Sequence, residues 1–368
     1  MRAVSPRPKR ASRCRHKRRR GLTKTQVGIL SHELTQRHQA SLHRYRVRLT
    51  PGEHNRAHMH MHMQSLILHH YDFSNYAEKV RLALGYKGQT WHSVEIPPVA
   101  PKPDLQALTG GYRRTPVLQL GADIFCDTRL ILRVLDSVKR EPLLFPKEHA
   151  AQASAIAYWA ETQLFRPISL YVSGNNPDVF PLSLQADRAR MRGRTPPTAD
   201  AMKRAAARNA PLVRTQLPVV EQMLASGGPW IMGKVTTIAD FSIYHALWFI
   251  TGRTERLAFE LEPFQRIKRW MSRMRNFGHG SRNDLAAAEA LRIAAAACPA
   301  EPGRARAYKE DPQLGSRVRI RADDYGREAV EGELVQAGVH DIAIARHDTD
   351  LGDVVVHFPR LGYDLRAL

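Results

Sequence analysis

An alternation of strand-like and helix-like patterns between residues 66 and 138 restricts this chain to a small set of folds. The apolar run at 66–68 is typical of a buried strand, and 75–85 repeats apolar residues at helical spacing. Further along come a weakly alternating strand at 91–96, a proline-rich loop at 97–103, strands at 115–120 and 123–126, and a helix at 128–138. The predicted order is β-α-β, loop, β-β-α in about 80 residues, the size of a compact α/β domain.

The rest of the chain changes period twice. Residues 148–297 are rich in alanine and have helical spacing, which predicts an all-helical domain. Thr237 and Asp240 have the spacing of a capping box in front of a strongly apolar helix. After the proline and glycine of 299–304 the period becomes two, so we expect residues 305–368 to form a small all-β module of four or five strands, with a barrel as one option.

The formal net charge of +21 is concentrated at the N-terminus. Residues 1–63 hold 16 basic and two acidic residues and so contribute +14, whereas the remaining 40 basic and 33 acidic residues contribute +7. We expect 1–63 to be a disordered basic leader, because it has too few apolar residues to form a core. Two alternatives stay open: an arm for nucleic acid or an anionic surface at 15–20, or an upstream translation with Met63 as the natural start. For the folded part we do not expect nucleic acid as a partner.

Composition excludes several other classes of protein. No apolar run reaches the roughly 18–20 residues needed to cross a bilayer, and no secretory signal precedes the fold, so we expect a cytoplasmic protein without a membrane partner. Cys14, Cys126 and Cys298 are far apart and form no CxxC pair, which argues against disulfides and a zinc site. We therefore expect no metal, and we expect Cys126 to be a buried apolar residue.

Hydroxyl residues stand at two predicted strand-to-helix junctions. Ser74 precedes the first helix, and Asp127 with Thr128 begins the next helix of the α/β region. A helix N-terminus offers unpaired N–H groups and partial positive charge, so Ser74 can stabilise a thiolate and Thr128 a carboxylate. Asp127 can hold an ammonium group. Each residue can equally be a plain N-cap, and the residue types alone do not decide between the two roles.

The segment before the third predicted strand supplies two further candidate contacts. A cis bond between Thr115 and Pro116 would turn the Thr115 backbone outward to pair with an extended peptide. Arg114 can face a second carboxylate, although exposed loop arginines are usually only solvated. A ligand with an α-amino acid end, a peptide backbone and a thiol fits all of these contacts, and glutathione is such a ligand.

Four stretches resemble glutathione S-transferases. They are FSNYAEKVRLALG (73–85), RRTPVL (113–118), CDTRLILRVL (126–135) and TTIADFSIYHAL (236–247), and the resemblance covers 64–297. It implies a thioredoxin-like glutathione-binding domain at 64–142, an all-helical domain at 148–297 and a homodimer. The β-module has no counterpart in the common two-domain form, which suggests a bacterial branch.

The resemblance implies that Ser74 is the catalytic hydroxyl and that Arg114, Thr115, Pro116, Asp127 and Thr128 bind glutathione as co-substrate. Omega-type members have a cysteine where Ser74 stands, so thiol transfer is not expected here. Conjugation to a small electrophile or glutathione-assisted isomerisation is the expected chemistry. Tyr158 and Phe165 are candidates for the electrophile pocket, with a plain core role as the alternative. The competing interpretation of the whole chain is a non-catalytic adaptor or sensor.

Overall fold

A computed structural model of the chain describes residues 65–180, 182–225, 227–301, 303 and 306–368. The predicted basic leader, 1–63, lies outside the described residues. Among the described helices, none combines the length and the hydropathy needed to cross a membrane.

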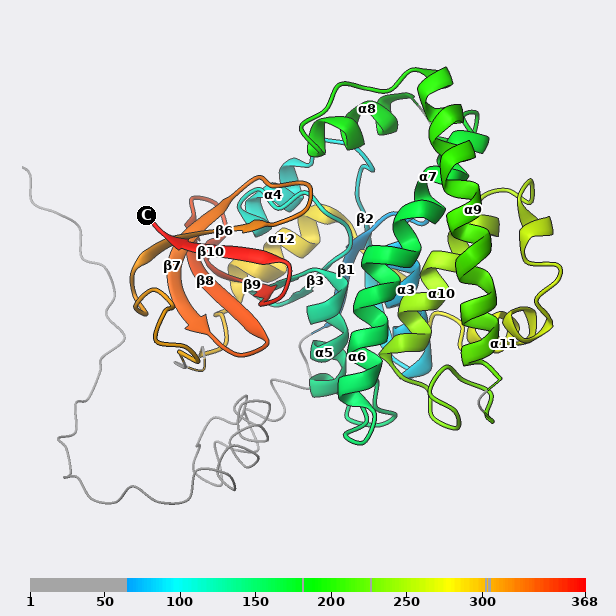
Figure 1. The fold of residues 1–368 in the computed structure, drawn as a ribbon. Helices are drawn as coiled ribbons and strands as arrows, with labels where there is room; N and C mark the ends of the chain where they lie inside the picture. The colour runs from blue at the N-terminus through cyan, green and yellow to red at the C-terminus, as the bar shows by residue number, and fades with distance from the viewer. Residues whose placement is uncertain (1–64, 181, 226, 302, 304–305) are drawn as a thin grey trace, which may run out of the picture. The chain divides into compact units, whose positions relative to one another are not determined.

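The predicted α/β region is present, and its strands form one part of a ten-stranded sheet (Figure 1). Its elements are β1 (Ile67–His70), α3 (Asn75–Tyr86), β2 (Thr90–Glu95), α4 (Pro103–Thr109), β3 (Val117–Leu120), β4 (Asp123–Cys126) and α5 (Thr128–Val138). β1 pairs in parallel with β2 and antiparallel with β3, and β3 pairs antiparallel with β4. The short helix α4 was not predicted, because seven residues are too few to show a helical period.

The two faces of this sheet belong to two different cores. Leu68, Leu118 and Phe125 pack with α3, α5 and the helical bundle. Their neighbours Ile67 and Val117 face the other way, toward α4 and the C-terminal strands. Successive side chains of a strand point to opposite faces, so strands buried on both sides appear in the sequence as continuous apolar runs.

The predicted helical domain is present and includes the predicted capping box. Its elements are α6 (Ala150–Trp159), a π-helical turn η1 (Ala160–Leu164), α7 (Phe165–Asn175), α8 (Leu182–Met191), α9 (Ala199–Met223), α10 (Ile238–Thr251), a short 3-10 turn η2 (Ala258–Glu260) and α11 (Gln265–Arg275). Thr237 and Asp240 form the capping box at the start of α10, as predicted. The buried Asp240 carboxylate also accepts a hydrogen bond from Trp270 Nε1 at 3.0 Å, which ties α10 to α11.

The expected helical domain is shorter than predicted at its C-terminal end. Strand β5 (Ser281–Asp284) pairs in parallel with β2, and α12 (Ala287–Ala296) packs into the core on the α4 side of the sheet. The sequence of β5, SRND, is polar and fully exposed at the sheet edge, so it carries no apolar strand pattern. Gly85 lies inside α3, where a Cβ atom would stand 2.1 Å from the Gly278 carbonyl oxygen of the chain leading to β5.

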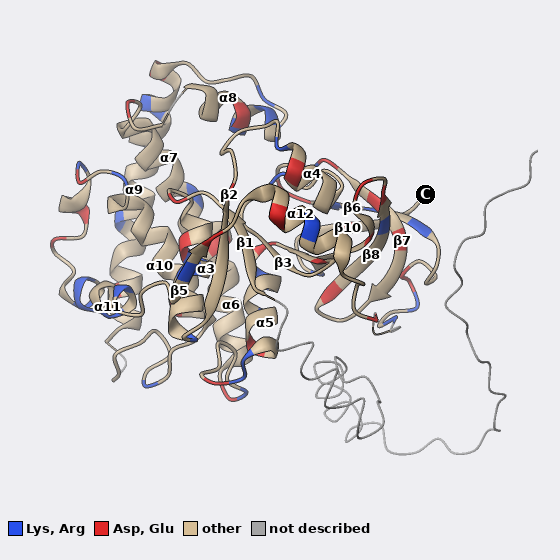
Figure 2. Cartoon of the chain, turned by 180° about the vertical axis from the view of Figure 1, so that it is seen from behind, with Lys and Arg blue, Asp and Glu red and all other residues tan. Residues whose placement is uncertain are grey.

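The five C-terminal strands are present but do not form a separate module. They are β6 (Arg317–Ala322), β7 (Val330–Ala337), β8 (Asp341–Asp348), β9 (Gly352–Pro359) and β10 (Tyr363–Ala367), and we call them the appended strands. β9 pairs in parallel with β4, so the appended strands continue the central sheet. The helical bundle and the appended strands lie on opposite sides of β1–β4 (Figure 1 and Figure 2). Strand pairing across more than 200 residues leaves no local signal, which is why the sequence suggested an independent unit.

The appended strands must also curl. Their order is β10-β6-β7-β8-β9, so β9 and β10 stand at opposite ends of the set. In a flat sheet these two strands would be about 19 Å apart, at four spacings of roughly 4.8 Å. The connection from Pro359 to Tyr363 spans at most about 14 Å. The curvature brings Tyr363 back toward β9, and therefore toward the end of β4.

We expect Phe358→Ala to destabilise the whole described fold. Phe358 is 1% exposed and packs against Tyr112 at a ring-centroid distance of 5.9 Å. Loss of the ring should lower the free energy of unfolding by about 3–5 kcal/mol. All five tryptophans lie between Trp91 and Trp270, so their fluorescence in a urea titration reports only on the remainder of the fold.

The control for this experiment is Leu361→Ala, because Leu361 is 64% exposed and should be nearly neutral. A tryptophan transition that stays unmoved in Phe358→Ala would show that the appended strands unfold independently.

Candidate functional site

The sheet brings the candidate residues to one of its ends. His69 on β1 is opposite Val117 on β3, and Val117 is opposite Cys126 on β4. β3 therefore begins and β4 ends in the same row, and β1 ends one residue beyond it. Ser74, Thr115 and Asp127 are in the segments that adjoin these three ends. The pairing of these strands therefore places the three residues at the same end of the sheet.

Ser74 is the N-cap of α3. Its Oγ accepts a hydrogen bond from the Ala77 N–H at 3.2 Å, and the residue is 5% exposed. A hydroxyl group has one hydrogen to donate as well as lone pairs to accept, so capping does not use the Ser74 hydrogen. The Ser74 hydroxyl is hydrogen-bonded to the Tyr71 hydroxyl, a partner that a ligand could replace. The two roles that the sequence left open are therefore compatible. The nearby Tyr71 hydroxyl accepts a hydrogen bond from Arg188 at 2.8 Å.

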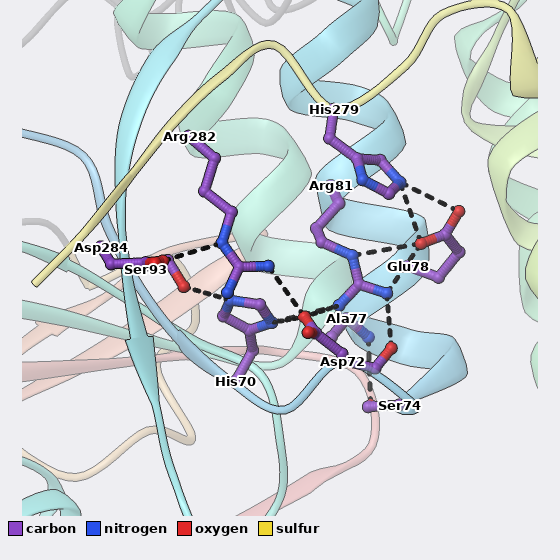
Figure 3. Close-up of polar contacts among 10 residues, drawn as sticks. All are labelled: His70, Asp72, Ser74, Ala77, Glu78, Arg81, Ser93, His279, Arg282 and Asp284. Atoms are coloured by element: carbon purple, nitrogen blue, oxygen red, sulfur yellow. Dashed lines mark hydrogen bonds and ion pairs between the residues drawn. The ribbon is translucent and has the colours of Figure 1, made fainter.

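A network of polar contacts next to Ser74 stabilises the loop between β1 and α3 (Figure 3). Arg81 donates to the Asp72 carbonyl at 2.7 Å and to the Glu78 carboxylate at 2.7 Å. Its Nη1 is also 3.1 Å from Nδ1 of the buried His70. Burial, together with the charge of Arg81, lowers the pKa of His70 to about 3, so this imidazole stays neutral. The network fixes the backbone that presents Ser74.

The peptide bond between Thr115 and Pro116 is cis. The Thr115 hydroxyl accepts a hydrogen bond from Lys102 Nζ at 3.1 Å. Lys102 is 9% exposed, and among the described residues no carboxylate lies within ion-pair distance of it. Burial, with the charges of Arg188 and Arg113, lowers the pKa of Lys102 to about 7. The sequence does not point to Lys102, because a lysine in a proline-rich segment carries no recognisable signal.

Asp127 and Thr128 form the start of α5. Asp127 is the only non-glycine residue with positive φ in the described part of the chain (φ 74°, ψ 134°). Such a conformation costs of order 1–3 kcal/mol and is concentrated at functional sites. The Asp127 side chain accepts from the Arg129 N–H at 2.9 Å, and Thr128 is 3% exposed. Capping and ligand binding again use the same residues.

A buried ion pair connects the two helix N-termini with the helical domain. Lys79 on α3 is fully buried and pairs with Glu161 in η1. Lys79 Nζ also donates to Thr128 Oγ1 at 3.3 Å, and Arg129 donates to Glu161 at 3.2 Å. Burial alone would raise the pKa of Glu161, but Lys79 and Arg129 outweigh it and lower the pKa to about 2. Ser242 on α10 completes the group by donating to Glu161 at 3.0 Å.

Arg114 binds the loop that joins β6 and β7 of the appended strands. Its guanidinium donates to the Asp324 carboxylate and to the Tyr325 carbonyl, and it lies 4.3 Å from the centre of the Tyr325 ring. Arg113 pairs in the same way with Glu328 and Asp187. The sequence predicted a ligand carboxylate at Arg114; in the structure a carboxylate of the same chain is there instead. The loop between β6 and β7 thus forms one border of the site.

The two candidates for the electrophile pocket, Tyr158 and Phe165, lie in different surroundings. Tyr158 is 48% exposed, and Arg129 lies 5.2 Å from the centre of its ring. Phe165 joins an aromatic group with Tyr76 at 5.3 Å and Phe249 at 5.5 Å. Cys126 is fully buried and its pKa is raised by burial, so its thiol is unreactive, as expected. In the described residues, no group of three or more His, Cys, Asp or Glu side chains could hold a metal ion.

Comparisons with known proteins agree with this architecture. The family model "Glutathione S-transferase, N-terminal domain" matches residues 68–142, and "Glutathione S-transferase, C-terminal domain" matches 191–277. A GST-like protein from Pseudomonas syringae has a solved structure that is 39% identical, with a TM-score of 0.69. That similarity covers 83% of this chain and all of the other. The chain belongs to the glutathione S-transferase family.

The Pseudomonas syringae protein shares more than the two common domains. The 83% that is matched is more than the share of the chain in residues 64–297, so the similarity extends beyond the two common domains.

Two other solved structures have much lower similarity. A glutathione S-transferase from Rhodospirillum rubrum F11 is 20% identical, covering 57% of this chain and 87% of that one, with a TM-score of 0.44. FzlA from C. crescentus is 22% identical, covering 57% and 88%, with a TM-score of 0.43. A search of curated proteins found no match.

We expect Lys79→Met to lower the free energy of unfolding at pH 7 by about 3 kcal/mol, because it leaves the Glu161 carboxylate buried with Arg129 as its remaining cation. In the wild type the folded pKa of Glu161 lies below its ordinary value of 4.5. Its contribution is therefore complete above pH 4.5 and is lost as the pH falls toward 2. The variant should show a smaller loss over this pH range, measured by urea unfolding.

Lys268→Met is the matched control, since Lys268 forms an exposed pair with Glu262 and should change stability by less than about 1 kcal/mol. Equal effects of the two substitutions would contradict a structural role for the buried pair.

Proposed function

We propose that this protein binds glutathione at the sheet end formed by Ser74, Thr115 and Asp127, and that it activates the thiol for attack on a small electrophile. The observation that carries the proposal is the Ser74 geometry. Its Oγ accepts from Ala77 as the N-cap of α3, which does not use its hydrogen, and a ligand thiolate can take the place of the Tyr71 hydroxyl as its partner. The partial positive charge of the helix N-terminus favours the same ionised form.

Three contacts would hold the peptide. The backbone of Thr115 pairs with the cysteinyl residue, and the N-terminus of α5 at Thr128 takes the γ-glutamyl carboxylate. Asp127 takes the α-ammonium group. For the glycyl carboxylate we propose Lys102 in place of Arg114, because Lys102 is a buried cation without a carboxylate partner in the described residues, whereas Arg114 already has one.

The chemical step is nucleophilic attack by sulfur. A free thiol has a pKa near 8.5, so only a few per cent is thiolate at neutral pH. Donation from Ser74, with the helix N-terminus, lowers that pKa and so raises the thiolate fraction. The sulfur electron pair then forms a carbon–sulfur bond; in conjugation a leaving group departs with its electron pair, and in isomerisation the sulfur is released again.

The aromatic group around Phe165 suggests the kind of electrophile. Tyr76 lies two residues after Ser74, and its ring is 4.6 Å from the ring of His245. Nε2 of His245 is buried and has no hydrogen-bond partner in the described residues. An apolar, preferably aromatic, electrophile with one polar group would match this wall.

A non-catalytic adaptor or sensor is the second candidate. The occupation of Arg114 by Asp324 and Tyr325 favours it, because the appended strands take up a cation that the family pattern would offer to a ligand. The two candidates differ in thiol chemistry: only the transferase lowers the pKa of bound glutathione.

We expect Ser74→Ala to raise the pKa of enzyme-bound glutathione by about one to two units, each worth about 1.4 kcal/mol. The measurement is the ultraviolet absorbance of the thiolate in the complex as a function of pH. Below that pKa, kcat/KM with 1-chloro-2,4-dinitrobenzene should fall about 10- to 100-fold.

Because Ser74→Ala also removes an N-cap, the matched control is Thr198→Ala. Thr198 caps α9 through an equivalent bond to the Ala201 N–H at 3.2 Å and is exposed. It should lose about 1 kcal/mol of stability without any change in the thiol pKa. A thiol pKa that Ser74→Ala leaves unchanged would rule out activation by this residue.

We expect the affinity for S-methylglutathione to fall as the pH rises above about 7, because Lys102 loses its charge there while the carboxylate keeps its own. The methylated ligand has no ionisable thiol, and its α-ammonium group titrates alike with wild type and variant, so the difference between the two proteins reports on Lys102. Titration calorimetry should show a steeper dependence in the wild type than in Lys102→Met. The glycyl amide of S-methylglutathione is the control ligand; if its affinity shows the same pH dependence, Lys102 does not bind the glycyl carboxylate.

A further inference from the structure

Asp127 is held from two directions. Its backbone is in the left-handed region, which a non-glycine residue adopts only when its surroundings enforce it. Its Oδ1 accepts the Arg129 N–H at 2.9 Å, and its Oδ2 accepts the Tyr363 hydroxyl at 3.2 Å. One oxygen is therefore fixed by α5 and the other by β10 of the appended strands.

The position of Tyr363 follows from the curl of the appended strands. β9 runs parallel to β4 and continues past its end, so the turn into β10 comes next to Asp127. Arg129 Nη1 donates to the Leu361 carbonyl in this turn at 2.9 Å. The ring of Tyr363 packs on Phe358 at 5.5 Å, and its hydroxyl lies 3.1 Å from the Tyr112 hydroxyl. Both ends of the tyrosine are thus held.

We propose that Tyr363 is a positioning residue that orients the Asp127 carboxylate toward the α-ammonium group of the ligand. This inference rests on the proposed function, and it makes the appended strands part of the glutathione site. A carboxylate has about four lone-pair positions, so the bonds from Arg129 and Tyr363 leave room for an ammonium group. Burial keeps the pKa of Tyr363 well above its ordinary value, so its hydroxyl remains a donor to Asp127.

The loop between β6 and β7 supports the same assignment. Arg114, which donates to Asp324 and Tyr325 in this loop, also lies 5.8 Å from the centre of the Tyr363 ring. The Gly326 N–H donates to the Met191 carbonyl at the end of α8 at 2.7 Å. These contacts anchor the loop beside the Tyr363 ring, and the Arg129–Leu361 bond anchors the turn before it, so both restrain Tyr363 near Asp127.

The test compares glutathione with deaminated glutathione, which lacks only the α-amino group. Titration calorimetry on the full chain should give tighter binding of glutathione by the wild type. Tyr363→Phe keeps the ring and removes the hydroxyl, and it should weaken glutathione about 5- to 20-fold while leaving the deaminated ligand within about twofold. Tyr112→Phe should weaken glutathione in the same direction but less.

Tyr308→Phe is the matched control, because Tyr308 precedes the appended strands and is 45% exposed. It should bind both ligands as the wild type does. If Tyr363→Phe weakens both ligands equally, or neither, Tyr363 does not act through the ammonium contact and the inference fails.

Two wild-type outcomes separate this inference from the proposed function. Wild type that binds both ligands equally well overturns the inference but leaves thiol activation standing. Wild type that binds neither ligand overturns both.

Discussion

The buried pair between Lys79 and Glu161 is the contact on which the arrangement of the site depends. It joins the helix that Ser74 caps to the π-helical turn of the helical domain, and Lys79 also reaches Thr128. Burying two charges is costly unless each finds good partners, and here Arg129 and Ser242 complete the set around Glu161. A shift of either domain would break several of these bonds together, so the distance between the two helix N-termini is closely fixed.

The site therefore consists of three layers with different origins. The sheet provides the common edge, the helical domain anchors the two helix N-termini, and the appended strands close the side next to Arg114 and Asp127. The third layer distinguishes this chain from a two-domain glutathione transferase. It gives Arg114 and Asp127 partners within the chain, Asp324 and Tyr363.

Much of this could be predicted from local patterns, and the rest could not for identifiable reasons. The bounds of β4 and α5 and the capping box at Thr237 agree with the sequence, because each depends on side chains within a few residues. The partners of Lys79 and Arg114 are 82 and 210 residues away, and ion pairs at such separations leave no periodic signal. β5 was missed because an exposed polar edge strand does not alternate, and the pairing of β9 with β4 because edge strands do not encode their neighbours.

The pairing of β4 with β9 has a consequence for how the protein is made. β4 pairs with β9 through Asp123 and Val355, so β4 lacks this neighbour until β9 has been synthesised. The sheet therefore cannot be completed until nearly the entire chain has left the ribosome. Contacts of such long sequence separation form slowly, and an unpaired strand is exposed to association with other chains in the meantime. We therefore expect the N-terminal half to be sensitive to aggregation and to chaperone supply during synthesis.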